Sequence, residues 1–149
     1  MPTPFYMVDL SLPSVDLVYA LINNDNDTAY TSSKLTLGIP STAFAGSPKN
    51  RNTVVAASRV GYPLDNLSLY YDRLNLAKVN FHNTQITIAK NVGDNHTYDL
   101  LPRLNTALGT NLAENDIINY PISTGASTIV ITMNPESYAW QGTFTVHYE

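Results

Sequence analysis

Residues 62–72 read YPLDNLSLYYD, and residues 138–148 read YAWQGTFTVHY. Each stretch starts at a tyrosine and ends in a segment whose apolar residues occupy every second position: Leu67, Leu69 and Tyr71 in the first, and Phe144, Val146 and Tyr148 in the second. Such alternation predicts β-strands that turn one apolar face toward a core. Because the arrangement occurs twice, it indicates a chain built from two similar halves.

The segments that precede these two stretches also match each other. An aliphatic run comes before each stretch, TVVAA at residues 53–57 and TIVIT at residues 128–132. Neither run alternates strictly, so both are predicted to be buried strands. Farther upstream, DLVYAL at residues 16–21 parallels DLLPRL at residues 99–104.

Each half therefore has the order strand, helix, extended segment, strand, strand. We predict an α+β fold in which residues 1–149 form a single compact unit of two pseudo-repeats, about residues 5–76 and 79–149. Each half is expected to pack its helix on a small, mostly antiparallel sheet. The alternative is that the halves look alike only because any two α+β units share such patterns.

The first helix is predicted from a cap and an apolar face. Ser14 is a candidate N-cap for a helix that starts near Val15. Its apolar face is formed by Leu17, Val18, Leu21 and Ile22. The polar run at residues 23–27 is predicted to stop it.

The second helix is predicted over about residues 97–108, with Thr97 as its cap. Pro102 falls later than a proline is comfortable in a helix, so the helix is predicted to start nearer Leu101 or to be kinked. Gly109 is well placed to end it. Leu104 shares one face with Leu101 and is predicted to be buried.

The remaining segments give weaker patterns. Strands or extended segments are predicted at residues 5–10, 34–38 and 85–90, a short helix at 113–118, and a turn at 134–137. Residues 40–52 are rich in Ser, Gly, Pro and Asn and predict the longest loop of the chain.

Composition limits the classes of function. Charged residues make up 13% of the 149, about half the usual share of roughly 25%. The net charge is −4, and the eight Lys and Arg residues do not cluster, which argues against nucleic-acid binding. No apolar run is long enough to predict a membrane span, and the first residues do not resemble a signal peptide. The chain has no cysteine, so disulfides and thiol chemistry are excluded.

No reactive cluster is evident in the sequence. Residues 25–28 alternate oxygen ligands as calcium loops do, but they lack the glycine and the final glutamate of such loops, and a helix-ending turn explains them equally well. His82, His96 and His147 lack the spacing of a zinc pair, and His147 is expected on the opposite strand face from Phe144. We therefore expect no enzymatic activity, no cofactor and no small-molecule substrate.

Aromatic residues are the candidates for contacts with other proteins. The chain has ten Tyr against four Phe. Tyr70 and Tyr71 are consecutive on a predicted strand, so one can fill the core while the other reaches the surface or a partner. Phe44 lies between alanines in the loop at 40–52, where it either anchors a neighbour or folds back onto its own core. Trp140 completes the set of interface candidates, and strand propensity is the alternative explanation for the tyrosines.

Several of these motifs resemble one family. The segments concerned are NTVV at 52–55, GY at 61–62, LSLYYDRL at 67–74, LINNDN at 21–26, LLPRLNTALGTNL at 100–112, DI at 116–117 and SYAWQGTFTV at 137–146. Together they are similar to virion structural proteins of large tailed bacteriophages, from about residue 16 to the end. The matching residues are turn and core residues, so the resemblance transfers no catalytic residue.

The resemblance implies a component of a phage particle, found in the virion and assembled in the host cytoplasm. Its expected partners are other virion proteins and copies of itself, as in a head decoration, neck, collar or tail protein. The alternative function is a carbohydrate- or receptor-binding module of a phage particle, which would use aromatic and Asn-rich loops.

Overall fold

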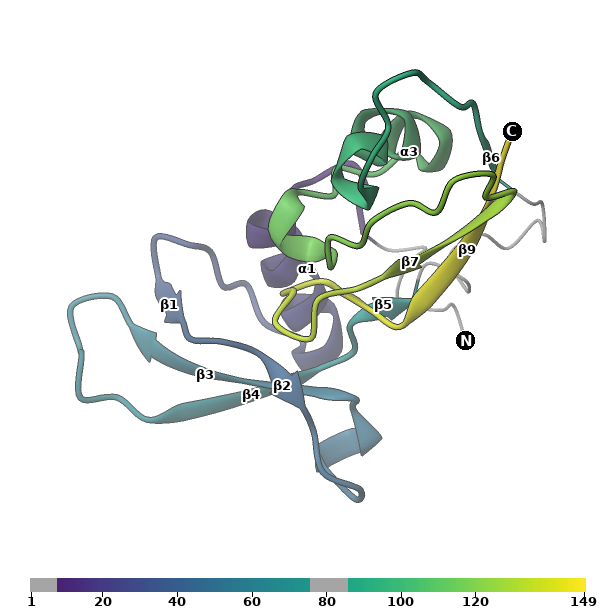
Figure 1. Ribbon diagram of the computed structural model, residues 1–149. Coiled ribbons are helices and arrows are strands. Elements are labelled where there is room, and N and C mark those ends of the chain that lie inside the picture. Colours follow the sequence, from purple (N-terminus) through teal and green to yellow (C-terminus); the bar gives the residue numbers. More distant parts are fainter. Residues whose placement is uncertain (1–7, 76–85) are drawn as a thin grey trace.

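The computed structural model describes residues 8–75 and 86–149 (Figure 1). Its elements, in chain order, are α1 (Ser14–Asn26), β1 (Leu35–Leu37), β2 (Ser41–Thr42), β3 (Thr53–Arg59), β4 (Leu67–Tyr71), β5 (Leu74–Asn75), β6 (Thr87–Ile88), α3 (Leu101–Leu108), β7 (Thr128–Thr132), β8 (Trp140–Gln141) and β9 (Thr143–Tyr148). Short 3-10 helices occupy Pro48–Asn50, Thr97–Leu100 and Glu114–Asp116. Helices and small sheets are mixed along the chain, so the predicted α+β class is confirmed.

The first sheet is antiparallel and has β3 at its centre. β4 pairs with one edge of β3, and β1 and β2 share the other edge. Val55 of β3 lies opposite Leu69 of β4, and Ala57 lies between Leu67 of β4 and Leu37 of β1. In Figure 1 this sheet extends to the lower left, away from α3, β7 and β9.

The second sheet has β9 at its centre, with β7 antiparallel on one side and β6 parallel on the other. β5 and β8 form a separate parallel pair in which Leu74 lies opposite Trp140. Burial along β9 alternates, with Phe144, Val146 and Tyr148 inside and His147 on the other face, as predicted. The two parallel pairings were not foreseen, because parallel neighbours are distant in the sequence.

Helix α1 buries the predicted face, which includes Leu17, Leu21 and Ile22. The prediction that Ser14 caps the helix is wrong. Pro13 occupies the N-cap position, and the hydroxyl of Ser14 donates a hydrogen bond to the carboxylate of Asp116. A serine at the start of a helix can cap the helix or bond elsewhere, and here its hydroxyl bonds to a buried acceptor about a hundred residues away in the sequence.

The second helical segment starts as a 3-10 turn and becomes α-helical at Leu101, so Pro102 falls in the first turn of α3. At that position the missing N–H of proline has no helical partner to lose. Leu104 is fully buried, as predicted, and Gly109 ends the helix with a φ of 69°. The start of this segment is set by His96 and not by Thr97, because the Asp99 carboxylate accepts the backbone N–H of His96.

Helices α1 and α3 end in the same hydrogen-bonded arrangement. After α1, Asn23 Oδ1 accepts the N–H of Tyr30 (2.7 Å) and the hydroxyl of Thr28 (2.8 Å), and its amide nitrogen donates to the Tyr30 carbonyl (2.8 Å). We call this arrangement the asparagine clamp. It holds the chain that leaves the helix against the last helical turn.

After α3, Asn105 forms a second asparagine clamp. Its Oδ1 accepts the N–H of Leu112 (2.8 Å) and the hydroxyl of Thr110 (2.9 Å), and its amide nitrogen donates to the Leu112 carbonyl (3.0 Å). In both clamps the threonine is five residues and the backbone partner seven residues after the asparagine. The residue at the fourth position, Asp27 or Gly109, is left-handed.

The core is continuous across the two parts of the chain, since one cluster of buried side chains contains residues of α1, β3, α3, β7 and β9. Buried polar groups join the parts as well. The guanidinium of Arg73 donates to the carbonyls of Pro135 (2.7 Å) and Ser137 (3.1 Å). Asp116 accepts the hydroxyls of Ser14 and Ser137.

Some predicted segments are shorter or different in the structure. Residues 113–118 contain a 3-10 turn at Glu114–Asp116 in place of an α-helix, and the strand predicted at 85–90 is reduced to β6. Residues 8–10 form no strand, and residues 5–7, 76–84 and Gln85 lie outside the described residues. Among the described residues, no helix has the length and hydrophobicity needed to cross a membrane.

Candidate interaction surfaces

The first candidate surface is an exposed aromatic pair beside the first sheet. Phe44 is 61% exposed and does not belong to the core. Its ring meets that of Tyr70 edge-to-face, with centroids 6.2 Å apart and an interplanar angle of 88°. Phe44 therefore neither folds back onto the core nor stands alone, because Tyr70 on β4 supports it from one side.

The aromatic pair continues an uncharged sheet face. Side chains that alternate away from the core on β1, β3 and β4 form this outer face: Thr36, Val54, Ala56, Ser58, Ser68 and Tyr70. All six are exposed or half-buried, and none carries a charge. The result is an uncharged surface that ends at Phe44 and Tyr70.

The loop that carries Phe44 is held by its own hydrogen bonds. Residues 40–52 contain two short elements, β2 and the 3-10 turn Pro48–Asn50, and otherwise form the predicted loop. The N–H of Ala43 donates to the carbonyl of Asn52 (2.8 Å), and the buried Ser47 hydroxyl donates to the carbonyl of Arg51 (2.7 Å). These bonds hold the base of the loop closed and present Phe44 outward.

A charged cluster fixes the end of the same loop to α1. Asp25 is buried, accepts the N–H of Asp72 (2.7 Å), and lies 3.5 Å from the Arg51 guanidinium, which also pairs with the Asp72 carboxylate at 2.9 Å. Burial raises the pKa of Asp25, and the Asp72 N–H and Arg51 partly oppose this shift. The carboxylate that resembled a calcium ligand in the sequence is thus turned toward an arginine and a backbone amide.

The other two interface candidates lie inside the chain. Tyr71 is 0% exposed, and its hydroxyl donates to the carbonyl of Tyr138 (2.7 Å). Trp140 is 1% exposed and sits in β8, beside Leu74 of β5. Both side chains are therefore buried in the core of this chain. The expectation that Tyr70 and Tyr71 divide between surface and core is met.

A second exposed surface is the tip of the β3–β4 hairpin. Val60, Tyr62 and Leu64 are all more than half exposed there. Arg59 and Asp65 form a bidentate ion pair across the tip, with Nε donating to Oδ2 at 2.7 Å and Nη2 donating to Oδ1 at 3.2 Å. These hydrogen bonds lower the pKa of Asp65. The tip lies farthest from α3 in Figure 1.

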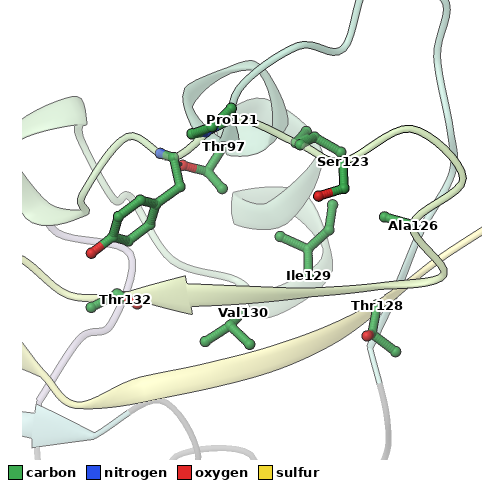
Figure 2. Close-up of a pocket in the computed structure, with 10 residues that line it drawn as sticks. Thr97, Pro121, Ser123, Ala126, Thr128, Ile129, Val130 and Thr132 are labelled. Carbon is green, nitrogen blue, oxygen red and sulfur yellow. The ribbon is translucent and has the colours of Figure 1, made fainter.

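The third feature is an open hollow beside β7, which we call the β7 groove (Figure 2). The groove has a volume of about 420 Å³ and lies between β7 and the segment at residues 120–126. Ile129 and Ser123 point toward each other across it in Figure 2, with Thr97 at its back. All ten lining residues are uncharged.

Sequence reasoning missed the two asparagine clamps, the buried Arg73 and Asp116, and the β7 groove. The clamps could have been found from the sequence, since an asparagine near the end of α1 and of α3 is followed five residues later by a threonine. Asp116 and Arg73 have none, because their partners are far away in the sequence. The groove depends on how residues 118–126 leave the edge of β7, which no local pattern indicates.

Comparison with known proteins identifies the family. Residues 7–149 match the model of a family of unknown function, DUF7941, and the chain belongs to that family. Neither a curated protein nor a solved structure matches the chain significantly.

Proposed function

We propose that this chain is a non-enzymatic structural subunit of a tailed-phage virion, acting through contacts with other virion proteins and with copies of itself. The observation that carries the contact role is the exposed Phe44, held against Tyr70 at the end of an uncharged outer face. The assignment to the virion depends on the resemblance of the turn and core motifs described above.

The exposed aromatic pair has the properties of an interface centre. Aromatic residues are enriched and charged residues depleted at the core of protein interfaces. A ring that is fixed by its own loop and by a second ring loses little conformational freedom when a partner covers it, so more of the burial energy is retained. Phe44 meets this condition because Ala43 and Ser47 pin the loop on both sides of it.

The same proposal includes an internal duplication, in which α1 with β1, β3 and β4 corresponds to α3 with residues 117–118, β7 and β9. The two asparagine clamps support it, since the same three hydrogen bonds with the same residue spacing end both helices. The strands support it too. Leu35 of β1 pairs with Arg59 at the end of β3, and Ile117 pairs with Met133 just after β7.

The alternative function, a carbohydrate- or receptor-binding module, has less support. Trp140 is buried and offers no ring for stacking on a sugar. The exposed rings would then be those of Phe44, Tyr62 and Tyr120, which lie in three separate segments of the chain. A glycan array tests this alternative directly.

The decisive experiment is Phe44→Ala, with incorporation into particles and thermal stability both measured. Incorporation should fall at least tenfold. Stability should fall by no more than about 1.5 kcal/mol, because an exposed edge-to-face pair contributes about 0.5–1.5 kcal/mol. Val92→Ala is the matched control, since Val92 is a fully exposed apolar residue in the other half, and this variant should incorporate normally.

Three results would count against the proposal. Unchanged incorporation of Phe44→Ala would remove the anchor role. A loss of stability well above 1.5 kcal/mol would make Phe44 a folding residue. Mass spectrometry of purified virions that fails to detect the chain would remove the virion assignment. A contact role in another assembly could then still be tested with Phe44→Ala.

A further inference from the structure

Strand β7 has one edge paired and one edge open. The N–H of Tyr148 donates to the carbonyl of Ser127, and the N–H of Met133 donates to the carbonyl of Gly142. In an antiparallel ladder such bonded positions recur at every second residue, so Ile129 and Ile131 also turn their backbone groups toward β9. The backbone groups of Thr128, Val130 and Thr132 point to the opposite edge.

That opposite edge is only partly used. The carbonyl of Thr132 accepts the N–H of Ile118 (2.9 Å), after which the chain turns away from β7 toward Pro121. Within residues 8–75 and 86–149, no hydrogen bond reaches the backbone N–H or C=O of Thr128 or Val130. Thr128 is exposed and Val130 is 51% exposed.

The first sheet shows what covers such an edge. On β3, the carbonyl of Ala56 accepts the N–H of Gly38 (2.8 Å), and β1 pairs antiparallel through Thr36 opposite Ser58. Leu35 and Leu37 of β1 turn toward the core while Thr36 faces out. An extended segment with apolar residues at alternate positions therefore closes the edge of β3 that corresponds to the open edge of β7.

The β7 groove has the form needed for such a segment. Its floor is Ile129, its far wall is the segment carrying Ile122, Ser123 and Ala126, and its volume is about 420 Å³, within the usual range of roughly 300–1,000 Å³ for binding clefts. Figure 2 shows Ile129 and Ser123 on opposite sides of the space between β7 and the neighbouring segment. Because no lining residue is charged, the groove offers no ion pair to a charged partner.

We propose that the β7 groove binds one extended, uncharged polypeptide segment of a partner protein, which adds to the edge of β7 as an antiparallel strand. The N–H and C=O groups of Thr128 and Val130 supply the hydrogen bonds, and a β-branched or leucine side chain of the partner packs on Ile129. This is strand addition, in which the main chain provides affinity and alternate side chains provide specificity.

A single segment fits better than the edge of a second folded copy. Two copies could pair their β7 strands about a two-fold axis, but the wall at residues 120–126 stands beside the edge of β7 in each copy. A lone strand enters between the wall and β7, whereas a whole sheet would bring its own wall against the first. The partner is therefore an arm, a tail or a loop of a polypeptide.

The test uses the whole chain and a capped synthetic peptide of residues 35–39, LTLGI, which carries the β1 pattern and no charge. The peptide is titrated to about 1 mM, a concentration that detects even weak binding. NMR should show shifts confined to residues 118–132, and exchange of the Thr128 and Val130 amide protons should slow at least tenfold. Both amides should exchange rapidly before the peptide is added.

Two variants examine the mechanism. Val130→Pro removes one edge N–H without touching the β9 ladder, because proline is tolerated where the N–H faces away from a sheet. Ser123→Phe fills the groove and leaves the β7 backbone unchanged, so it serves if the proline variant fails to fold. Each should weaken peptide binding at least tenfold, while Leu64→Ala, an apolar truncation at the exposed tip of the β3–β4 hairpin, should bind as the parent does.

The proposal is overturned by any of four results. These are protected Thr128 and Val130 amides in the peptide-free chain, no binding at 1 mM, shifts located on β3 instead of β7, or undiminished binding by the Ser123→Phe variant. Self-association of the chain that Val130→Pro abolishes would also overturn it, because the occupant would then be a second copy.

Discussion

Replacing Asn105 with alanine should destabilise the protein by about 2–3 kcal/mol. The side chain makes three hydrogen bonds to Thr110 and Leu112, each worth about 1 kcal/mol net. Alanine returns roughly 0.6 kcal/mol because it is the better helix former. Thr110 and Leu112 are both buried, so water does not readily replace the lost partners.

The matched variant Asn23→Ala should cost less, about 1 kcal/mol. It removes the same three hydrogen bonds, but its partners Thr28 and Tyr30 are half-exposed and can bond to water. Asn24→Ala is the control on the same helix, since Asn24 is exposed and its side chain, within the described part of the chain, hydrogen-bonds the neighbouring Asp25. Its effect should stay within about 0.5 kcal/mol.

The assay is urea unfolding followed by the fluorescence of Trp140, the only tryptophan, which is buried in the folded chain. The refuting result is a cost below about 0.5 kcal/mol for Asn105→Ala, or a larger cost for Asn23→Ala than for Asn105→Ala. Either result would mean that the asparagine clamp forms because the helix ends there and does not itself stabilise the helix end.

Three further predictions concern the core, pH and metal. Leu104→Ala should cost roughly 2–5 kcal/mol in urea unfolding, because Leu104 is fully buried. The hydrogen bond from Arg103 lowers the pKa of Asp94. Asp94 therefore contributes stability above about pH 4, and this contribution is lost as the pH falls through its folded-state pKa. Asp94→Asn should be less stable at pH 7, and its stability should fall less steeply as the pH is lowered. EGTA should leave the melting temperature unchanged, because the carboxylate of Asp25 is occupied by Arg51 and a backbone amide.

Each of these has a control or an opposing outcome. The control for Leu104→Ala is Val92→Ala at a fully exposed position, which should change the stability by less than about 0.5 kcal/mol. If Leu104→Ala also costs less than about 0.5 kcal/mol, the register of α3 is wrong. An acid limb of the same steepness in Asp94→Asn would assign acid unfolding to other carboxylates. A melting temperature that falls with EGTA and recovers with calcium would revive the calcium hypothesis.

Local patterns predicted most of the secondary structure. Alternating residues such as Phe144 and Val146 gave β9, and Pro102 and Gly109 gave the start and end of α3. These features depend on residues within one or two turns of each other, since steric and hydrogen-bonding constraints act over that distance. The role of Ser14 was missed because its acceptor, Asp116, is about a hundred residues away.

The sequence alone therefore determined the α+β class, the positions of the main helices and strands, and the division of Tyr70 and Tyr71 between two faces. Only the tertiary structure decided which aromatic residues reach solvent. Trp140 is covered and Phe44 exposed although both are apolar, because burial depends on what distant segments bring against a side chain. The open edge of β7 was decided in the same way, since it exists only where residues 118–121 turn away from the strand.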